Sequence, residues 1–299
     1  GTLYNTYSFF SLYANVDGFE YKEADVPMVE RPEIDRWILS VLNTLVKEVD
    51  TCYSEYEPTK AGRLISDFVN DNLSNWYVRL NRKRFWGGEF TQDKLSAYQT
   101  LYTCLETVAK LMSPIAPFYA DKLYMDLVTA TGRDNVVPEY KEEMIDKELE
   151  VRMQMAQDVT SMVLALRRKV NIKVRQPLQC IMIPVVDEEQ RAHIEAVKAL
   201  IMSEVNVKDI KFVDGAAGVL VKKVKCDFKK MGPKFGKQMK AVAAAVAEMS
   251  QEAIAELEKN GSYTLQLDGT DVVVEAADVE IFSEDIPGWL VANEGKLTV

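Results

Sequence analysis

The sequence predicts a mainly helical protein in which an antiparallel helical bundle, residues 1–172, is followed by a smaller α+β domain, residues 173–299. Two patterns lead to this fold class. Between about residues 31 and 171, apolar side chains recur at spacings of three and four, the period of a helix with one buried face. Beyond Pro177, short apolar runs bounded by Gly, Pro or Asp are typical of strands, and two helical segments separate these runs.

The bundle is expected to contain helices at residues 3–14, 31–56, 59–85, 91–127 and 141–170. Local signals set their ends. Pro32 suits the opening turn of the second helix, and Gly87–Gly88 end the third. Thr91 is a capping residue for the fourth helix, which Pro114 and Pro117 kink or interrupt.

The second domain alternates strands and helices. Strands are expected at residues 178–186, 207–213, 219–228, 263–269, 270–282 and 289–299, and helices at residues 188–203 and 233–259. The single histidine, His193, lies in a polar-faced helical segment, so we expect a solvated surface side chain. The run from Gly232 to Lys237 has three residues between its glycines where a Walker loop has four, which favours a turn.

The composition is that of an ordinary soluble globular protein. The 299 residues are 47% hydrophobic and 27% charged, with a net charge of -10. No apolar run approaches the roughly 18 residues of a membrane span, and no signal peptide is evident, so we expect a cytoplasmic protein with no membrane partner. Four widely separated cysteines fit a reducing compartment and form no recognisable metal-binding pattern. The chain starts at Gly1 without a methionine, so we expect a piece of a longer protein.

The net charge conceals a strong segregation of basic residues. Three windows, residues 72–86, 167–175 and 222–240, hold 17 basic side chains and one acidic side chain, a net charge of +16. The other 256 residues hold 19 basic and 45 acidic side chains, a net charge of -26. Because acidic surfaces repel polyanions, such local basic surfaces indicate a nucleic acid held in one orientation.

The first window combines cations with aromatic rings. Helical spacing places four of its residues together on one flank: Arg79, Arg82, Lys83 and Trp86. This combination suits single-stranded RNA, because phosphates attract cations and unstacked bases stack on flat rings. A merely solvated helix flank would show the same residues, and Trp76 and Tyr77 fit the core better than a base platform.

The second window ends the last helix of the bundle. Its cations are Arg167, Arg168, Lys169, Lys173 and Arg175. A helix dipole favours cations at this end, so a purely structural role stays open for them. The third window is rich in lysine and poor in arginine, which suits non-directional attraction of phosphates better than base reading.

Five segments together resemble isoleucyl-tRNA synthetases, which are class I aminoacyl-tRNA synthetases, in the region that follows the catalytic core. They are GTLYNTYSFFSLYANVDGF, RPEIDRWILSVLNTLVKEV, NLSNWYVRLNRKRFW, LMSPIAPFYADKLY and LRRKVNIKVRQPL. Valyl enzymes share the DRWILS-type opening, whereas NWYVR followed by NRKRFW is more similar to the isoleucyl enzymes. The resemblance spans nearly all of the chain.

The resemblance implies that the bundle is an anticodon-binding domain of the class I synthetase type, and that the α+β segment is a C-terminal extension that helps to grip the tRNA. The parent enzyme would attach isoleucine to its tRNA with ATP and Mg, and would hydrolyse misloaded valine in an editing domain. The HIGH and KMSKS signatures of catalysis are absent from this sequence, so the resemblance implies a non-catalytic part without a cofactor of its own. Some members carry a C-terminal zinc module, which lies beyond Val299 or is missing from this branch.

The expected partners are an isoleucine tRNA and the catalytic and editing domains of the same polypeptide, with the chain itself monomeric. Charge clustering, not the resemblance, selects the residues expected to contact RNA: Arg79, Arg82, Lys83, Arg84, Trp86, Arg167, Arg168, Lys169, Lys173 and Arg175. Three alternatives stay open. They are the corresponding region of a valyl enzyme, a general RNA-binding module, and a helical interaction domain whose basic stripes meet an acidic protein.

Overall fold

The structure is a computed structural model, and it describes residues 1–133, 140–185, 187–214, 222–235, 239–267, 270–283, 291–294 and 297–298. The chain divides into two compact units, residues 1–153 and residues 154–299, which are described in turn. Part of the third basic window, residues 236–238, lies outside the described residues, and so does the second glycine of the predicted turn, Gly236.

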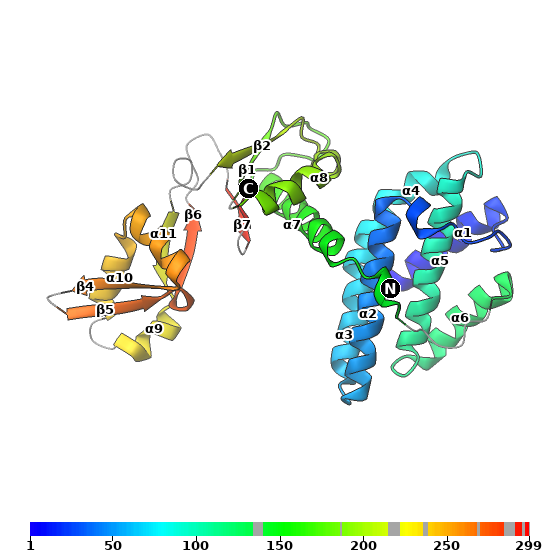
Figure 1. Cartoon of the computed structure of the whole chain (residues 1–299), viewed down its shortest axis with the longest axis horizontal. Coiled ribbons are helices and arrows are strands. Elements are labelled where there is room, and N and C mark those ends of the chain that lie inside the picture. The colour runs from blue at the N-terminus through cyan, green and yellow to red at the C-terminus, as the bar shows by residue number, and fades with distance from the viewer. Residues whose placement is uncertain are drawn as a thin grey trace. The chain divides into compact units, whose positions relative to one another are not determined.

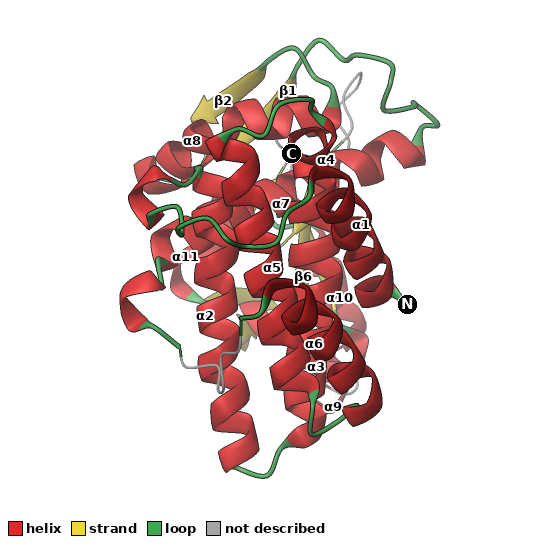
Figure 2. Cartoon of the chain, turned by 90° about the vertical axis from the view of Figure 1, so that its right-hand side faces the viewer, coloured by secondary structure: helices red, strands yellow, loops and turns green. Residues whose placement is uncertain are grey.

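The first unit is the predicted helical bundle (Figure 1). Its helices are α1 (Thr2–Asp17), α2 (Glu33–Ser54), α3 (Pro58–Asp67), α4 (Arg79–Trp86), α5 (Gln92–Met112), α6 (Pro117–Thr131) and the start of α7 (Lys147–Lys169). Short 3₁₀ turns at Met28–Glu30 and Glu142–Met144 lie in its connections. Helices make up most of the described chain, and strands are few and short (Figure 2), which confirms the mainly helical class.

Helix α5 is the centre of the bundle, because it packs against α1, α2, α3, α4 and α6. The sequence predicts one apolar stripe on this helix, but the structure buries consecutive residues around its first half. Polar side chains buried there are hydrogen-bonded: Gln99 accepts from the backbone N–H of Val26 at 2.9 Å, and Thr100 accepts from Arg31 at 2.7 Å. Buried polar groups need such partners, so the wider buried surface costs little stability.

Aromatic rings join α1, α4 and α5. Tyr98 of α5 is fully buried, and its ring stacks on Phe19 with a centroid distance of 5.0 Å. It also meets the edge of Phe85 of α4 at 5.1 Å, while Phe85 lies 5.2 Å from Phe9 of α1. Such pairs add to the hydrophobic effect, so the inner face of α4 is held firmly in the core.

The long third helix of the prediction, residues 59–85, is interrupted by a change of winding. The segment Phe68–Val78, between α3 and α4, is π-helical, with hydrogen bonds that span one residue more than in an α-helix. Such winding changes which residues share a face of the helix, and Leu80, two residues beyond this segment, is only half-buried. The helix ends before Gly87 as predicted, although Gly87 is extended, with φ -68° and ψ 150°, and not left-handed.

The predicted helix signals around α5 and α6 are confirmed. The hydroxyl of Thr91 accepts a hydrogen bond from the backbone N–H of Lys94 at 3.2 Å, as an N-cap should. Helix α5 ends at Met112, before Pro114, and Pro117 is the first residue of α6. The two prolines therefore separate two helices.

The first part of the second unit is a βαβ arrangement. Strand β1 (Ile181–Val185) pairs in parallel with β2 (Ile210–Asp214), and α8 (Glu188–Val205) connects them. The hairpin of β7 (Asn293–Glu294) and β8 (Leu297–Thr298) lies beside β1. The predicted helix at residues 188–203 is confirmed, and α8 supplies the crossover connection that parallel strands require.

The rest of the second unit has its own small core. Strand β3 (Lys222–Cys226) pairs antiparallel with β6 (Val279–Ser283), and β4 (Ser262–Leu267) with β5 (Thr270–Glu275). The single helix predicted at residues 233–259 is wrong: the structure has α9 (Phe228–Phe235), α10 (Met239–Ala247) and α11 (Gln251–Asn260). Ser250 caps α11 by accepting from the N–H of Ala253 at 3.2 Å. The breaks let the short helices cover a core that includes Met231, Val242 and Ile254.

The structure also bears on the expected exposure of His193 and on the expected boundary between the two domains. His193 on α8 is buried, with 9% of its surface exposed, so the expectation of a solvated histidine is wrong. The contacts divide the chain after Met153, within α7, whereas the change from helices to strands follows the end of α7 at Lys169. The functional division at residues 172/173 stays a prediction.

Candidate nucleic-acid interface

The outer flank of α4 presents three cations and one large ring to solvent. Arg79, Arg82 and Lys83 are exposed, and Trp86 has 56% of its surface exposed. Trp76 and Tyr77 are buried, with 5% and 0% exposure, so their predicted place in the core is confirmed. The flank therefore offers phosphate ligands beside a single aromatic surface.

Arg79 is partly ordered by its own helix. Its guanidinium lies over the Trp76 ring, 5.6 Å from the centroid, and its Nε donates to the backbone oxygen of Asn75 at 2.9 Å. Cation–π contacts of this kind restrict a side chain and leave its charge in place. The Arg79 side chain is thus held in a defined position on the exposed flank.

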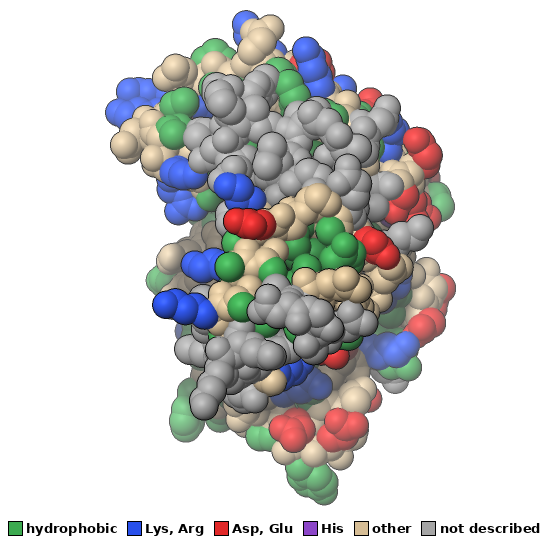
Figure 3. All heavy atoms as spheres, turned by 90° about the vertical axis from the view of Figure 1, so that its left-hand side faces the viewer, with side chains coloured by type: hydrophobic (Ala, Val, Ile, Leu, Met, Phe, Trp, Pro, Cys, Tyr) green, Lys and Arg blue, Asp and Glu red, His purple; other side chains and the backbone are tan. Residues whose placement is uncertain are grey.

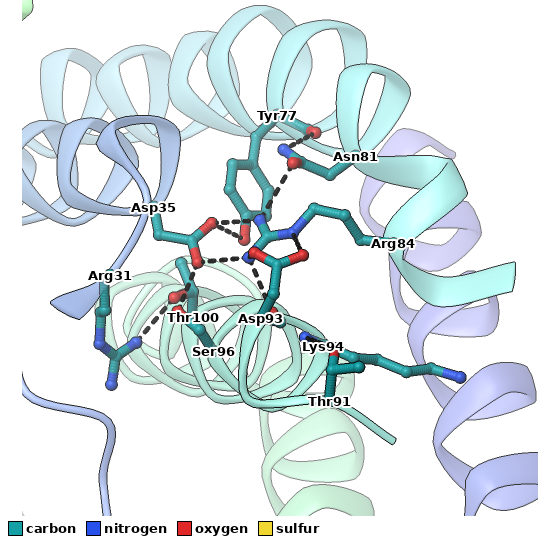
Figure 4. Close-up of polar contacts among 10 residues, drawn as sticks. All are labelled: Arg31, Asp35, Tyr77, Asn81, Arg84, Thr91, Asp93, Lys94, Ser96 and Thr100. Carbon is teal, nitrogen blue, oxygen red and sulfur yellow. Dashed lines mark hydrogen bonds and ion pairs between the residues drawn. The ribbon is translucent and has the colours of Figure 1, made fainter. Parts of the chain in front are cut away.

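Arg84 differs from its basic neighbours because it points into the bundle (Figure 4). Its two Nη atoms donate to the two carboxylate oxygens of Asp35 on α2, at 2.6 and 2.9 Å. Its Nε donates to Asp93 on α5 at 2.9 Å. Only 15% of the Arg84 side chain is exposed, so this guanidinium is used inside the protein and we leave it out of the proposed RNA contacts.

Asp35 is fully buried and collects three partners. Besides Arg84, it accepts from the hydroxyls of Tyr77 at 2.8 Å and Ser96 at 2.6 Å (Figure 4). Burial, followed by the nearby charge of Asp35, raises the pKa of Tyr77 well above its usual value. Burial alone lowers the pKa of Arg84, but hydrogen bonds to Asp35 and its charge raise it by more, so Arg84 stays charged. Helices α2, α4 and α5 meet at this buried carboxylate.

Arg167, at the end of α7, is the counterpart of Arg84 in the second window. It is 2% exposed, and its guanidinium donates to the backbone oxygens of Lys173, Gln176, Val205 and Asn206 at 2.7–3.2 Å. Two of these oxygens end α8, where the helix dipole favours a cation. Burial lowers the pKa of Arg167. Because its donors face the protein, we also leave Arg167 out of the proposed contacts.

The other four cations of the second window are exposed. They are Arg168, Lys169, Lys173 and Arg175. They lie on the last turn of α7 and on the loop that follows, in which Asn171 has a positive φ of 56°. Arg167 ties this loop to α8, so the exposed cations project from a fixed loop.

Ion pairs occupy part of the third window. Lys234 pairs with Asp278 at 2.7 Å and with Glu275 at 3.1 Å, and Lys230 donates to the backbone oxygen of Ala277 at 2.9 Å. Acidic and basic side chains lie next to each other on the face shown in Figure 3. These acids offset the local positive charge, so the described part of this window is less suited to phosphates than its sequence indicates.

Other chemistries find no support in the described residues. Within them, no group of three or more His, Cys, Asp and Glu side chains is placed to hold a metal ion. In the same part of the chain, we find no helix with the length and apolar character of a membrane span.

Comparison with known proteins agrees with this picture. A model of the anticodon-binding domain of tRNA ligases matches residues 35–182. The whole chain aligns with isoleucine–tRNA ligases of Bacteroides thetaiotaomicron, Porphyromonas gingivalis and Thermobifida fusca, with 90%, 63% and 36% identity. The chain belongs to the isoleucine–tRNA ligase family. It spans 26%, 26% and 29% of the length of these three relatives.

The family assignment confirms the resemblance to isoleucyl-tRNA synthetases, and it favours the isoleucyl over the valyl alternative. The family model starts at Asp35, the buried carboxylate that holds Arg84. It includes the exposed flank of α4. It also includes the end of α7 and the loop that follows, whose exposed cations Arg168, Lys169, Lys173 and Arg175 define what we call the basic loop. Residues 35–182, which include most of the bundle, therefore match the anticodon-binding domain of tRNA ligases.

Sequence reasoning missed the network around Asp35. A signal was present, because Asp35 shares a helical face with Ile38 and Leu42, at spacings of three and seven, and both are buried. A carboxylate on an apolar face needs a cation or hydrogen-bond donors. The sequence alone, however, offers many cations and does not say that Arg84 is the partner.

Proposed function

We propose that this chain is the tRNA-binding part of an isoleucine–tRNA ligase and that it recognises the anticodon arm. The whole ligase would attach isoleucine to its tRNA with ATP and Mg, as a cytoplasmic monomer, and the catalytic and editing chemistry would belong to its other domains. The observation that carries the proposal is the exposed flank of α4, where Arg79, Arg82 and Lys83 lie beside the exposed ring of Trp86.

This flank suits an RNA loop. Unstacked anticodon bases have flat faces that stack on an indole ring, and the phosphates between them attract guanidinium and ammonium groups. Trp86 would supply the ring, while Arg79 and Arg82 would supply directional hydrogen bonds to phosphates. The flank thus provides both kinds of contact within two turns of one helix.

The basic loop would contact RNA in a different way. Arg168, Lys169, Lys173 and Arg175 are exposed without a large aromatic ring among them. A-form stems are bound mainly through phosphates and 2′-hydroxyl groups, for which cations alone suffice. We therefore assign the α4 flank to the anticodon loop and the basic loop to a helical stem.

A charge reversal on α4 tests the proposal. In Arg79→Glu/Arg82→Glu, two phosphate contacts are lost and two repulsive charges are gained, so affinity for an isoleucine tRNA should fall at least about tenfold. Binding would be measured by fluorescence anisotropy at low salt, and the melting temperature by circular dichroism. Both side chains are exposed, so the melting temperature should change little.

The matched control is Lys60→Glu/Arg63→Glu on α3. Both side chains are exposed and lie outside the flank. This double variant changes the net charge of the chain by the same amount as the α4 variant. An equal loss of tRNA affinity in both double variants would show that only the net charge matters. A tRNA with a changed anticodon completes the test, because equal affinity for both tRNAs would contradict anticodon recognition and leave a general RNA-binding module. Binding of neither tRNA would leave the protein-interaction alternative.

A further inference from the structure

Arg84 lies on the side of α4 opposite to the exposed flank. Successive residues of an α-helix are turned by about 100°, so Arg79, Arg82, Lys83 and Trp86 fall within an arc of about 100° centred about 150° from Arg84. The exposures agree, because those four residues are exposed and the Arg84 side chain is 15% exposed. Whatever holds Arg84 therefore also sets the direction in which the flank points.

Arg84 is held by two different helices. Its Nη atoms donate paired hydrogen bonds to Asp35, which lies in the first turn of α2. Its Nε donates to Asp93, which lies in the first turn of α5. A further bond joins Nη2 to the backbone oxygen of Asp93 at 2.8 Å. A planar guanidinium that is bonded on two edges cannot turn without breaking several of these contacts.

The rotation of α4 matters for recognition at its surface. At the outer radius of a helix, about 5–6 Å, a rotation of about 20° moves a side chain by about 2 Å. Hydrogen bonds tolerate only about 0.5 Å of variation in length. The π-helical segment before α4 gives its winding less regular support than a continuous α-helix would. The packing of Phe85 in the core limits this rotation, and a side-chain contact such as that of Arg84 limits it further.

We propose that Arg84 and Asp93 are positioning residues for tRNA binding: their contact, together with the Arg84–Asp35 pair, fixes the rotation of α4 and aims Arg79, Arg82, Lys83 and Trp86 at the RNA. The inference rests on the proposed function of the flank. Arg84 acts through the protein and does not touch the nucleic acid.

Asp93→Asn is the most informative variant, because positioning and electrostatics predict opposite signs. The Asp93 side chain is 52% exposed, so removal of its negative charge from an RNA-binding domain should strengthen binding if only charge matters. Loss of its ionic contact with Arg84 loosens α4, and affinity for an isoleucine tRNA should instead fall about three- to tenfold. The exposed carboxylate also makes unfolding of the variant less of a concern than for the buried Asp35.

Arg84→Lys and Asp71→Asn complete the set. Arg84→Lys keeps the charge but loses the paired geometry, so it should also weaken binding, and Asp93→Asn should then have little additional effect. Asp71 is an exposed carboxylate on the π-helical segment, so Asp71→Asn is the matched control, with unchanged or slightly higher affinity. Binding of the 299-residue chain would be measured by fluorescence anisotropy at fixed salt, with melting temperatures alongside.

Three results would overturn the inference. Unchanged or tighter binding by Asp93→Asn would show that charge alone matters. Additive losses in the Arg84→Lys/Asp93→Asn double variant would show that the two residues act separately. An equal loss in Asp71→Asn would show that the loss is not specific to the contact. If the unaltered chain binds no tRNA, the proposed function itself fails, and this inference fails with it.

Discussion

Arg84 and Arg167 have the same side chain as their exposed neighbours, yet their surroundings differ completely. Arg84 bonds to two carboxylates, whereas Arg167 bonds to backbone oxygens from two segments. A buried guanidinium loses its hydration, and only several well-placed acceptors offset that cost. Each of the first two basic windows, residues 72–86 and 167–175, thus contains one arginine that stabilises the local structure and others that face solvent.

Arg167 gives a prediction that separates stability from binding. Arg167→Met removes four hydrogen bonds and leaves four backbone oxygens without this donor, so the free energy of unfolding of the second unit should fall by about 2–4 kcal/mol. Urea unfolding, followed by circular dichroism, would measure it.

The neighbour Arg168 is the control for Arg167. Its side chain is exposed, so Arg168→Met should change the free energy of unfolding by no more than about 0.5 kcal/mol. It should weaken tRNA binding instead. A large loss of stability in Arg168→Met, or none in Arg167→Met, would contradict this division of roles.

At the scale of elements, α5 organises the bundle. It packs against α1, α2, α3, α4 and α6, Thr91 caps its start, and its first turn holds the Arg84 partner Asp93. Lys94 adds a pair with Asp17 at 2.6 Å and donates to the backbone oxygen of Gly87 at 2.7 Å. The start of α5 therefore connects α1, α2 and α4.

The cap of α5 can be tested directly. Thr91→Ala removes the acceptor for the N–H of Lys94, so the free energy of unfolding of the bundle should fall by about 1 kcal/mol. Thr91→Ser keeps the hydroxyl and should retain most of the stability. Thermal unfolding of both variants would measure the difference, and equal losses would indicate that the methyl group of Thr91 matters and not the cap.

The helices of the bundle were largely predictable because short-range sequence signals determine them. The apolar period of α2, the cap at Thr91 and the break at Pro117 act within a few residues, where the sequence is sufficient. The π-helical segment and the three helices in place of one at residues 233–259 were not predictable. They depend on how a helix packs against partners that are distant in sequence.

At the scale of the whole molecule, basic side chains are clustered within an otherwise acidic chain, and only some of the clustered cations are exposed to solvent. The net charge of -10 repels a polyanion at a distance, while exposed cations on α4 and the basic loop attract it locally. Such a protein should bind tRNA only where those cations meet phosphates. It should therefore show little binding to unrelated nucleic acids at physiological salt.

The salt dependence of binding checks this partition. If about six phosphates are neutralised, the logarithm of the affinity should fall against the logarithm of the salt concentration with a slope of about -4 to -5. A titration between low and moderate salt would measure the slope for the 299-residue chain. A flat dependence would contradict phosphate contacts and favour a protein partner.

The sequence by itself determined the fold class, the family and the clustering of cations, because period, motif and charge are properties of neighbouring residues. Only the tertiary structure decided what each cation does. Arg84 turns inward because Asp35 and Asp93, 49 and 9 residues away in sequence, lie beside it in the fold, while Arg82 and Lys83 next to it remain exposed. A buried charge needs partners that the fold brings together, and the order of residues along the chain does not name them.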